Sequence, residues 1–144
     1  MAGRRKPFER ALQEGHNYAW DQQWPRAISA YQRALKEFPD DAAVRASLAQ
    51  AYAAAGQPDA ARQEYERLLA SDPADEASLR RLCEILAGAG DAAGAVVRLN
   101  AAADRAEKAG DLAGAADLLR FAVGLAPADA ASHARLAGIC ESLG

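Results

Sequence analysis

AAVRASLAQAYAAAGQPDAARQEYERLLASDPAD, residues 42–75 of the chain, contains two apolar segments separated by a tight turn. In both segments the apolar residues recur every three or four positions, as they do on one face of an α-helix. Gly56 and Pro58 mark the turn, and Pro73 ends the second segment. These residues therefore predict two short helices joined as a hairpin.

The same pattern recurs along the chain with a period of 34 residues. The N-terminal neighbour has matching residues at Gly15, Tyr18, Ala27, Tyr31, Ala34 and Pro39, which correspond to Ala49, Tyr52, Ala61, Tyr65, Leu68 and Pro73. On the C-terminal side, Leu82, Cys83 and Gly90 correspond to Leu48, Ala49 and Gly56. A fixed period of this size is typical of stacked helical repeats, in which each unit buries its apolar face against its neighbours.

The composition favours an all-α chain. Apolar residues make up 51% of the 144 residues, which is enough for a core, and many of them are alanine. Alanine is the strongest helix former, and no run of β-branched and aromatic residues alternates with polar ones. We therefore predict about eight helices, near residues 8–20, 25–38, 42–55, 58–70, 76–89, 92–109, 112–126 and 130–143. Gly56 should end the third helix and Asp75 should cap the fifth.

The period fails after Gly90. The pair Gly90-Asp91 recurs at Gly110-Asp111 after only 20 residues. Residues 92–109 contain no proline and no turn cluster, so they predict one long helix rather than a hairpin. We expect a local kink or a change of concave face at this point.

The repeated residues resemble the tetratricopeptide repeat, a helix–turn–helix unit of this length. The small residues at its helix crossings correspond to Gly15, Ala27, Ala49, Ala61, Cys83 and Ala95. This chain departs from the family at Ala11 and Arg45, where Trp or Leu is common, and at Glu107, which replaces the third closing proline. The resemblance implies a right-handed α-solenoid of stacked antiparallel helix pairs, with an irregular long helix near 92–109.

The resemblance extends from Phe8 to the end of the chain. We expect a flexible basic tail at residues 1–7, followed by a single repeat domain at residues 8–144. Its units would be 8–41, 42–75, an irregular 76–109, a helix within 110–129 and a terminal helix within 130–144.

In this family the first helices of the units line a groove, so the resemblance implies a scaffold or adaptor that binds a peptide or helix of a partner protein. The corresponding partner-binding candidates are Leu12, His16, Trp20, Gln50, Arg80 and Glu84. An exposed Trp20 would suit a binding hot spot, whereas the alternative is that Trp20 packs over the turn against Trp24. Some family members clamp a terminal carboxylate, but only Arg81 matches that set, so such a clamp is not expected.

The last predicted helix suggests a second hypothesis. Apolar side chains would remain uncovered where such arrays usually end with a polar face: Leu136, Ile139, Cys140 and Leu143. Either the array continues in a longer chain, or this helix mediates self-association as an oligomerisation or assembly module. A regulatory part of a longer chain is a further alternative.

Charge and motifs disfavour other classes of function. The net charge of −3 disfavours a nucleic-acid partner, and no stretch is apolar enough for a membrane span. His16 and His133 lack neighbours at metal-ligand spacing, and the glycines do not form a phosphate loop. We therefore expect no enzyme activity, no metal and no cofactor. Cys83 and Cys140 are far apart and fit a reducing cytoplasm, and the alanine- and arginine-rich usage suggests a bacterial source.

Overall fold

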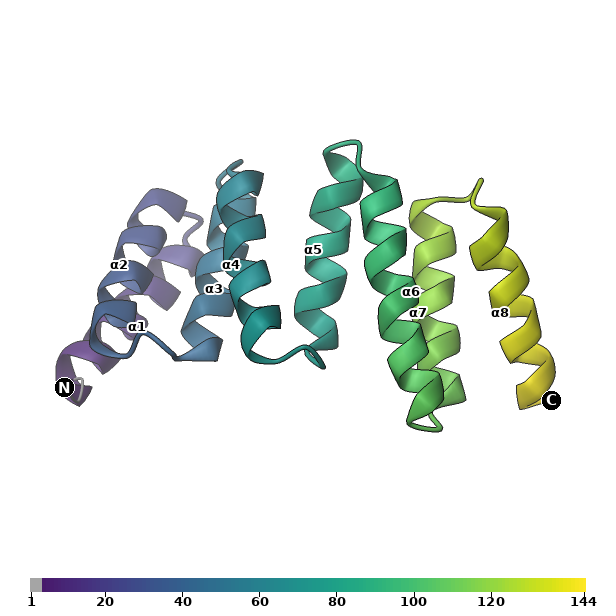
Figure 1. The fold of residues 1–144 in the computed structure, drawn as a ribbon. Helices are drawn as coiled ribbons and strands as arrows, with labels where there is room; N and C mark the ends of the chain where they lie inside the picture. The colour runs from purple at the N-terminus through teal and green to yellow at the C-terminus, as the bar shows by residue number, and fades with distance from the viewer. Residues whose placement is uncertain (1–3) are drawn as a thin grey trace. The chain divides into compact units, whose positions relative to one another are not determined.

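A computed structural model describes residues 4–144, and every regular element in this part of the chain is an α-helix (Figure 1). The prediction of an all-α fold is confirmed. Eight helices lie within these residues: α1 (Arg5–Trp20), α2 (Trp24–Glu37), α3 (Ala42–Ala54), α4 (Pro58–Ser71), α5 (Glu76–Gly88), α6 (Ala92–Lys108), α7 (Leu112–Leu125) and α8 (Ala130–Leu143). The long helix near residues 92–109 is also confirmed, because α6 continues for 17 residues without a break.

The chain divides into two compact units, Met1–Ser78 and Leu79–Gly144. The first unit contains α1 to α4, and the second contains most of α5 together with α6 to α8. Helices that follow one another within a unit run in opposite directions (Figure 1). The single domain expected over residues 8–144 stays a prediction.

The first helix begins earlier than the sequence indicates. It starts at Arg5 rather than Phe8, so part of the expected flexible tail is helical. Just before it, Arg4 donates to the carboxylate of Glu37 in α2, from its backbone N at 2.9 Å and from Nη2 at 3.0 Å. These bonds fix the start of α1 against α2. Residues 1–3 lie outside the described part of the chain, and for them the flexible tail stays a prediction.

Glycine and aspartate set the helix boundaries. Gly56 and Gly90, which lie just after α3 and α5, have φ angles of 77° and 89°. Glycine adopts this left-handed conformation without steric cost. At the start of α5, Asp75 accepts a hydrogen bond from the backbone N of Ser78 at 3.2 Å. Because these signals are local, the helix boundaries could be predicted to within a few residues.

Small residues allow close helix contacts in the first unit. A side chain on Gly15 would collide with Tyr31, because its Cβ would lie 2.5 Å from Cε1 of the ring. Ala27 and Ala61 are completely buried in α2 and α4, at equivalent positions of their repeats. Tyr31 and Tyr65 are buried beside them. The core therefore combines close backbone approach with two large rings that fill the remaining space.

An ion pair in the second repeat replaces two alanines of the first. Ala11 and Ala30 are buried in the first repeat, and Arg45 and Glu64 lie 34 residues further on. Glu64 is 7% exposed, and it accepts hydrogen bonds from Arg45 Nη1 at 2.5 Å and from Arg67 Nη1 at 3.0 Å. The departure from the family pattern at Arg45 is thus matched by a buried carboxylate of opposite charge.

The second unit is organised around α6. Its centre holds one fully buried leucine from each of three helices: Leu82 of α5, Leu99 of α6 and Leu119 of α7. On the α5 side of α6, the Cys83 thiol lies 3.7 Å from the carbonyl oxygen of Ala95. On the α8 side, Asn100 Nδ2 donates to Ser132 Oγ at 3.1 Å. α6 therefore contacts α5 on one side and α8 on the other. It is a single helix between Gly90 and Gly110, where the 34-residue period predicts two. The expected kink or change of concave face stays a prediction.

Candidate functional site

An exposed tryptophan lies at the end of α1. Trp20 is 89% exposed, and Leu12 and His16 precede it by eight and four residues on the same face of the helix. Trp24, at the start of α2, is partly buried. The high exposure of Trp20 rules out the alternative that its ring packs over the turn.

His16 on this face is held by the neighbouring helix α2. Its Nδ1 lies 2.8 Å from the hydroxyl oxygen of Tyr31 in α2, and the two rings meet edge to face with centroids 5.5 Å apart. The Tyr31 hydroxyl is also hydrogen-bonded to Ser47 of α3. Burial raises the pKa of Tyr31 above 10.0, and the bond to Ser47 opposes that rise. One buried hydroxyl therefore links α1, α2 and α3 beneath the exposed face.

The other predicted site residues lie on α3 and α5. Gln50 is exposed on α3, one repeat after His16. In the second unit, Glu84 is exposed and its carboxylate lies 3.6 Å from Arg81. Arg80 is partly buried, and its guanidinium lies over the ring of Phe121 in α7, 4.9 Å from the centroid. Arg80 thus helps to pack α5 on α7, a contact between residues too distant in sequence to predict.

The six predicted residues form two groups. Four of them belong to the first unit, and Arg80 and Glu84 belong to the second. A binding role for any of the six stays a prediction.

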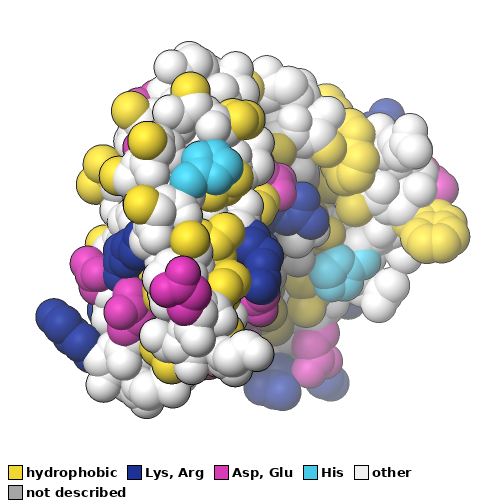
Figure 2. Space-filling view, turned by 90° about the vertical axis from the view of Figure 1, so that its right-hand side faces the viewer, with side chains coloured by type: hydrophobic (Ala, Val, Ile, Leu, Met, Phe, Trp, Pro, Cys, Tyr) yellow, Lys and Arg dark blue, Asp and Glu magenta, His cyan; other side chains and the backbone are white. Residues whose placement is uncertain are grey.

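The apolar face expected on the last helix is largely covered. Ile139 is buried, Leu136 and Cys140 are partly buried, and only Leu143, at 47%, remains well exposed among the four. The expectation of a broad uncovered face is therefore wrong, because α8 packs this side against α7. Figure 2 shows this end of the chain facing the viewer, with hydrophobic side chains lying among charged and histidine side chains.

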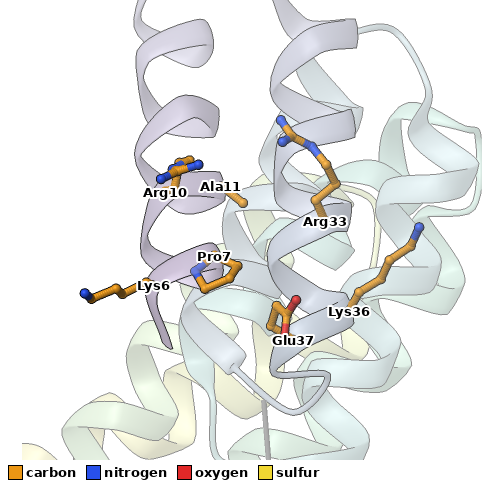
Figure 3. A pocket seen from close by; sticks show the side chains of 7 residues that line it. All are labelled: Lys6, Pro7, Arg10, Ala11, Arg33, Lys36 and Glu37. Atoms are coloured by element: carbon orange, nitrogen blue, oxygen red, sulfur yellow. The ribbon is translucent and has the colours of Figure 1, made fainter. Parts of the chain in front are cut away.

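A basic hollow between α1 and α2 is a feature that the sequence reasoning missed. It has a volume of about 360 Å³, and we call it the basic hollow after its lining: Lys6, Pro7, Arg10, Ala11, Arg33, Lys36 and Glu37 (Figure 3). The signal in the sequence is a pair of cations on each helix of the hairpin. Lys6 and Arg10 are four residues apart on α1, and Arg33 and Lys36 are three residues apart on α2. Lys6 lies within residues 1–7, for which the sequence predicts a flexible tail.

Within residues 4–144, no group of three or more His, Cys, Asp or Glu side chains is arranged to hold a metal ion. None of the helices in this range has the length and apolar character that crossing a membrane requires. Burial raises the pKa of the Cys83 thiol to about 11, which keeps it protonated at neutral pH.

Solved structures with this fold include proteins bound to other proteins or peptides. The TPR2B domain of yeast Sti1, solved as a complex with pHsp70, is similar with a TM-score of 0.68 and 22% identity over 85% of this chain and 98% of that one. The type III secretion chaperone SycD of Yersinia enterocolitica, solved with a peptide of the translocator YopD, has a TM-score of 0.55 and 17% identity over 96% of this chain and 93% of that one.

A third similar structure is part of an enzyme. The O-GlcNAc transferase of Thermobaculum terrenum has a TM-score of 0.57 and 17% identity over 93% of this chain, but only 22% of its own chain is covered. At these identities, the likeness establishes the fold alone.

The sequence itself carries the assignment to a family. No curated protein matches it. The sequence pattern of the tetratricopeptide repeat matches residues 11–86, which is more than half of the chain. This chain therefore belongs to the tetratricopeptide repeat family.

Proposed function

We propose that this protein is an interaction scaffold that presents the face of α1 around Trp20 to a peptide or helix of a partner protein. The exposure of Trp20, at 89%, is the observation that carries the proposal. An indole left in water contributes little to folding, whereas its burial against a partner removes a large apolar surface from water. Tryptophan is enriched among the residues that dominate binding energy.

The rigidity of this face favours binding. The bond between His16 and Tyr31 and the close contact of Gly15 with the Tyr31 ring hold α1 against α2. A surface that is already ordered loses less conformational entropy when a partner binds. The helix that carries Leu12 and Trp20 is therefore held in place, and both side chains can act as apolar contacts, with the imidazole of His16 between them.

We also propose a binding role for the remaining candidates, each within its own unit. Gln50 offers an amide on the first helix of the second repeat, and Glu84 offers a carboxylate in the second unit. Arg80 should contribute less, because its guanidinium already lies over Phe121. This role requires no covalent chemistry. We further propose that the protein acts in the cytoplasm of a bacterium.

The similar structures support a binding role. The Sti1 domain is in complex with pHsp70 and SycD is in complex with a YopD peptide, so this fold is known with partners bound. The likeness to part of the O-GlcNAc transferase favours the alternative of a regulatory part of a longer chain. Exposure of Leu143 favours self-association through α8, although burial of Ile139 leaves little apolar surface for it.

Peptides selected against the wild-type protein from a displayed random library would test the proposal. Trp20→Ala should weaken binding of the selected peptides by about tenfold or more. Val97→Ala is the matched control, because Val97 is an exposed apolar residue of α6 in the second unit. Equal affinity for wild type and Trp20→Ala would show that the proposal is wrong.

Self-association through α8 is tested by a separate measurement. If α8 does not mediate self-association, the wild type and Leu143→Glu should both sediment with the mass of a monomer at all protein concentrations. A wild-type dimer that Leu143→Glu dissociates would favour the assembly module.

A further inference from the structure

We propose that the basic hollow is a second binding site, which takes the carboxylates of an acidic peptide segment. It lies between the first half of α1 and the last turns of α2. In Figure 3, Pro7 and Ala11 lie between the two helices, with Lys6 and Arg10 on α1 and Arg33 and Lys36 on α2.

The charge of the hollow is not neutralised by its own acids. Glu37 accepts hydrogen bonds from the backbone N and guanidinium of Arg4, which lower its pKa, and Arg4 does not line the hollow. Glu14 pairs with Arg33 at 2.6 Å. Within residues 4–144, no ion pair joins a carboxylate to the remaining three cations of the lining: Lys6, Arg10 and Lys36.

The shape suits a side chain with its neighbouring backbone. A volume of about 360 Å³ lies in the range of ligand sites, and Pro7 and Ala11 give it an apolar floor. The cations of the lining are exposed, and Lys6 and Lys36 extend outward from this floor on opposite sides (Figure 3). These long side chains can turn towards a bound carboxylate while adjacent methylene groups cover Pro7 and Ala11. A nucleic acid would instead require cations spread along a track, and the net charge of −3 opposes it.

The second repeat shows the same hollow without the excess charge. Its lining includes Asp40, Arg45 and Arg67, in a volume of about 290 Å³. Both arginines are bound to the buried carboxylate of Glu64, and Asp40 adds a further negative charge. The first repeat has Ala30 in place of Glu64. The difference between repeats therefore leaves positive charge available in the basic hollow.

The basic hollow and the Trp20 face lie on different sides of α1. Arg10 and Leu12 are two residues apart, which separates their directions by about 200° around the helix axis. A partner could therefore occupy one of these surfaces without covering the other. For this reason, loss of binding at the basic hollow can be measured independently of the proposed function.

The test uses fluorescence anisotropy with a labelled peptide of glutamate and leucine, and the same peptide with glutamine in place of glutamate. The acidic peptide should bind the wild type, and the double variant Arg10→Gln, Lys36→Gln should lower its affinity about tenfold. The control Lys108→Gln, Arg120→Gln removes the same charge from exposed positions in the second unit. It should leave the affinity unchanged, and circular dichroism should show that all variants are folded.

Several outcomes would overturn the proposal. Equal binding of the glutamine peptide would exclude recognition of carboxylates, and an equal loss in both double variants would indicate an effect of net charge alone. Binding of oligo(dT) in preference to the acidic peptide would assign the hollow to nucleic acid. A decrease in affinity at high salt is expected, because the cations are exposed.

Discussion

The imidazole Nδ1 of His16 lies 2.8 Å from the hydroxyl oxygen of Tyr31, so a residue of the candidate binding face is bonded to the second helix of its own repeat. The same hydroxyl is hydrogen-bonded to Ser47 of the next repeat. A single buried side chain thus couples the stability of the first unit to the orientation of its exposed face.

Tyr31→Phe should remove this coupling. The loss of the hydroxyl bonds should lower the free energy of unfolding by about 1 kcal/mol at neutral pH. The pKa of Tyr31 is raised in the folded state, so the stability linked to its protonated form is present below pH 10 and is lost as the pH rises through the folded pKa. The difference between wild type and variant should therefore shrink above pH 10. Urea unfolding at a series of pH values measures it, and a constant difference would contradict this account.

Ala61→Leu should overpack the crossing of α3 and α4. Ala61 is completely buried, and added methyl groups at such a site cost about 1–3 kcal/mol. Ala53→Leu provides a control on an exposed position of α3 and should change stability little. An unchanged denaturation midpoint for Ala61→Leu would show that the repeats are aligned incorrectly.

Removal of one partner of the buried ion pair should cost more than removal of both. Arg45→Ala leaves the Glu64 carboxylate buried beside only Arg67, and the cost should be about 3 kcal/mol. The double variant Arg45→Ala, Glu64→Ala should be more stable than Arg45→Ala, because the first repeat packs alanine at both equivalent positions. Urea unfolding of both variants, and of Glu64→Ala, gives the coupling energy. If the losses of stability in Arg45→Ala and Glu64→Ala simply add up to the loss in the double variant, Arg45 and Glu64 do not interact specifically.

Cys83 should be unreactive in the folded protein. It is buried, and its pKa of about 11 leaves almost no thiolate near neutral pH. In the variant Cys140→Ala, Ellman's reagent should modify Cys83 only as fast as the protein unfolds. Modification at the same rate with and without urea would show that this thiol is accessible.

The sequence was informative wherever the signal was local or periodic. Gly56 and Asp75 identify helix boundaries, and the spacing of the buried alanines identifies the repeat. Contacts between distant residues were not predictable, since Arg80 and Phe121 are neither neighbours on one helix nor one period apart. The basic hollow was missed for the same reason, because it requires Arg10 and Lys36 to meet across a hairpin.

Fluorescence of Trp20 reports whether a partner covers its indole ring. The chain has two tryptophans, so Trp24→Phe leaves Trp20 as the only indole. Because Trp20 is 89% exposed, its emission in the unbound protein should be that of an indole in water. A selected peptide or natural partner should shift this emission to shorter wavelengths and protect it from acrylamide, in proportion to the fraction bound. Saturating binding with unchanged emission and quenching would contradict the claim that the face of α1 around Trp20 is the binding surface.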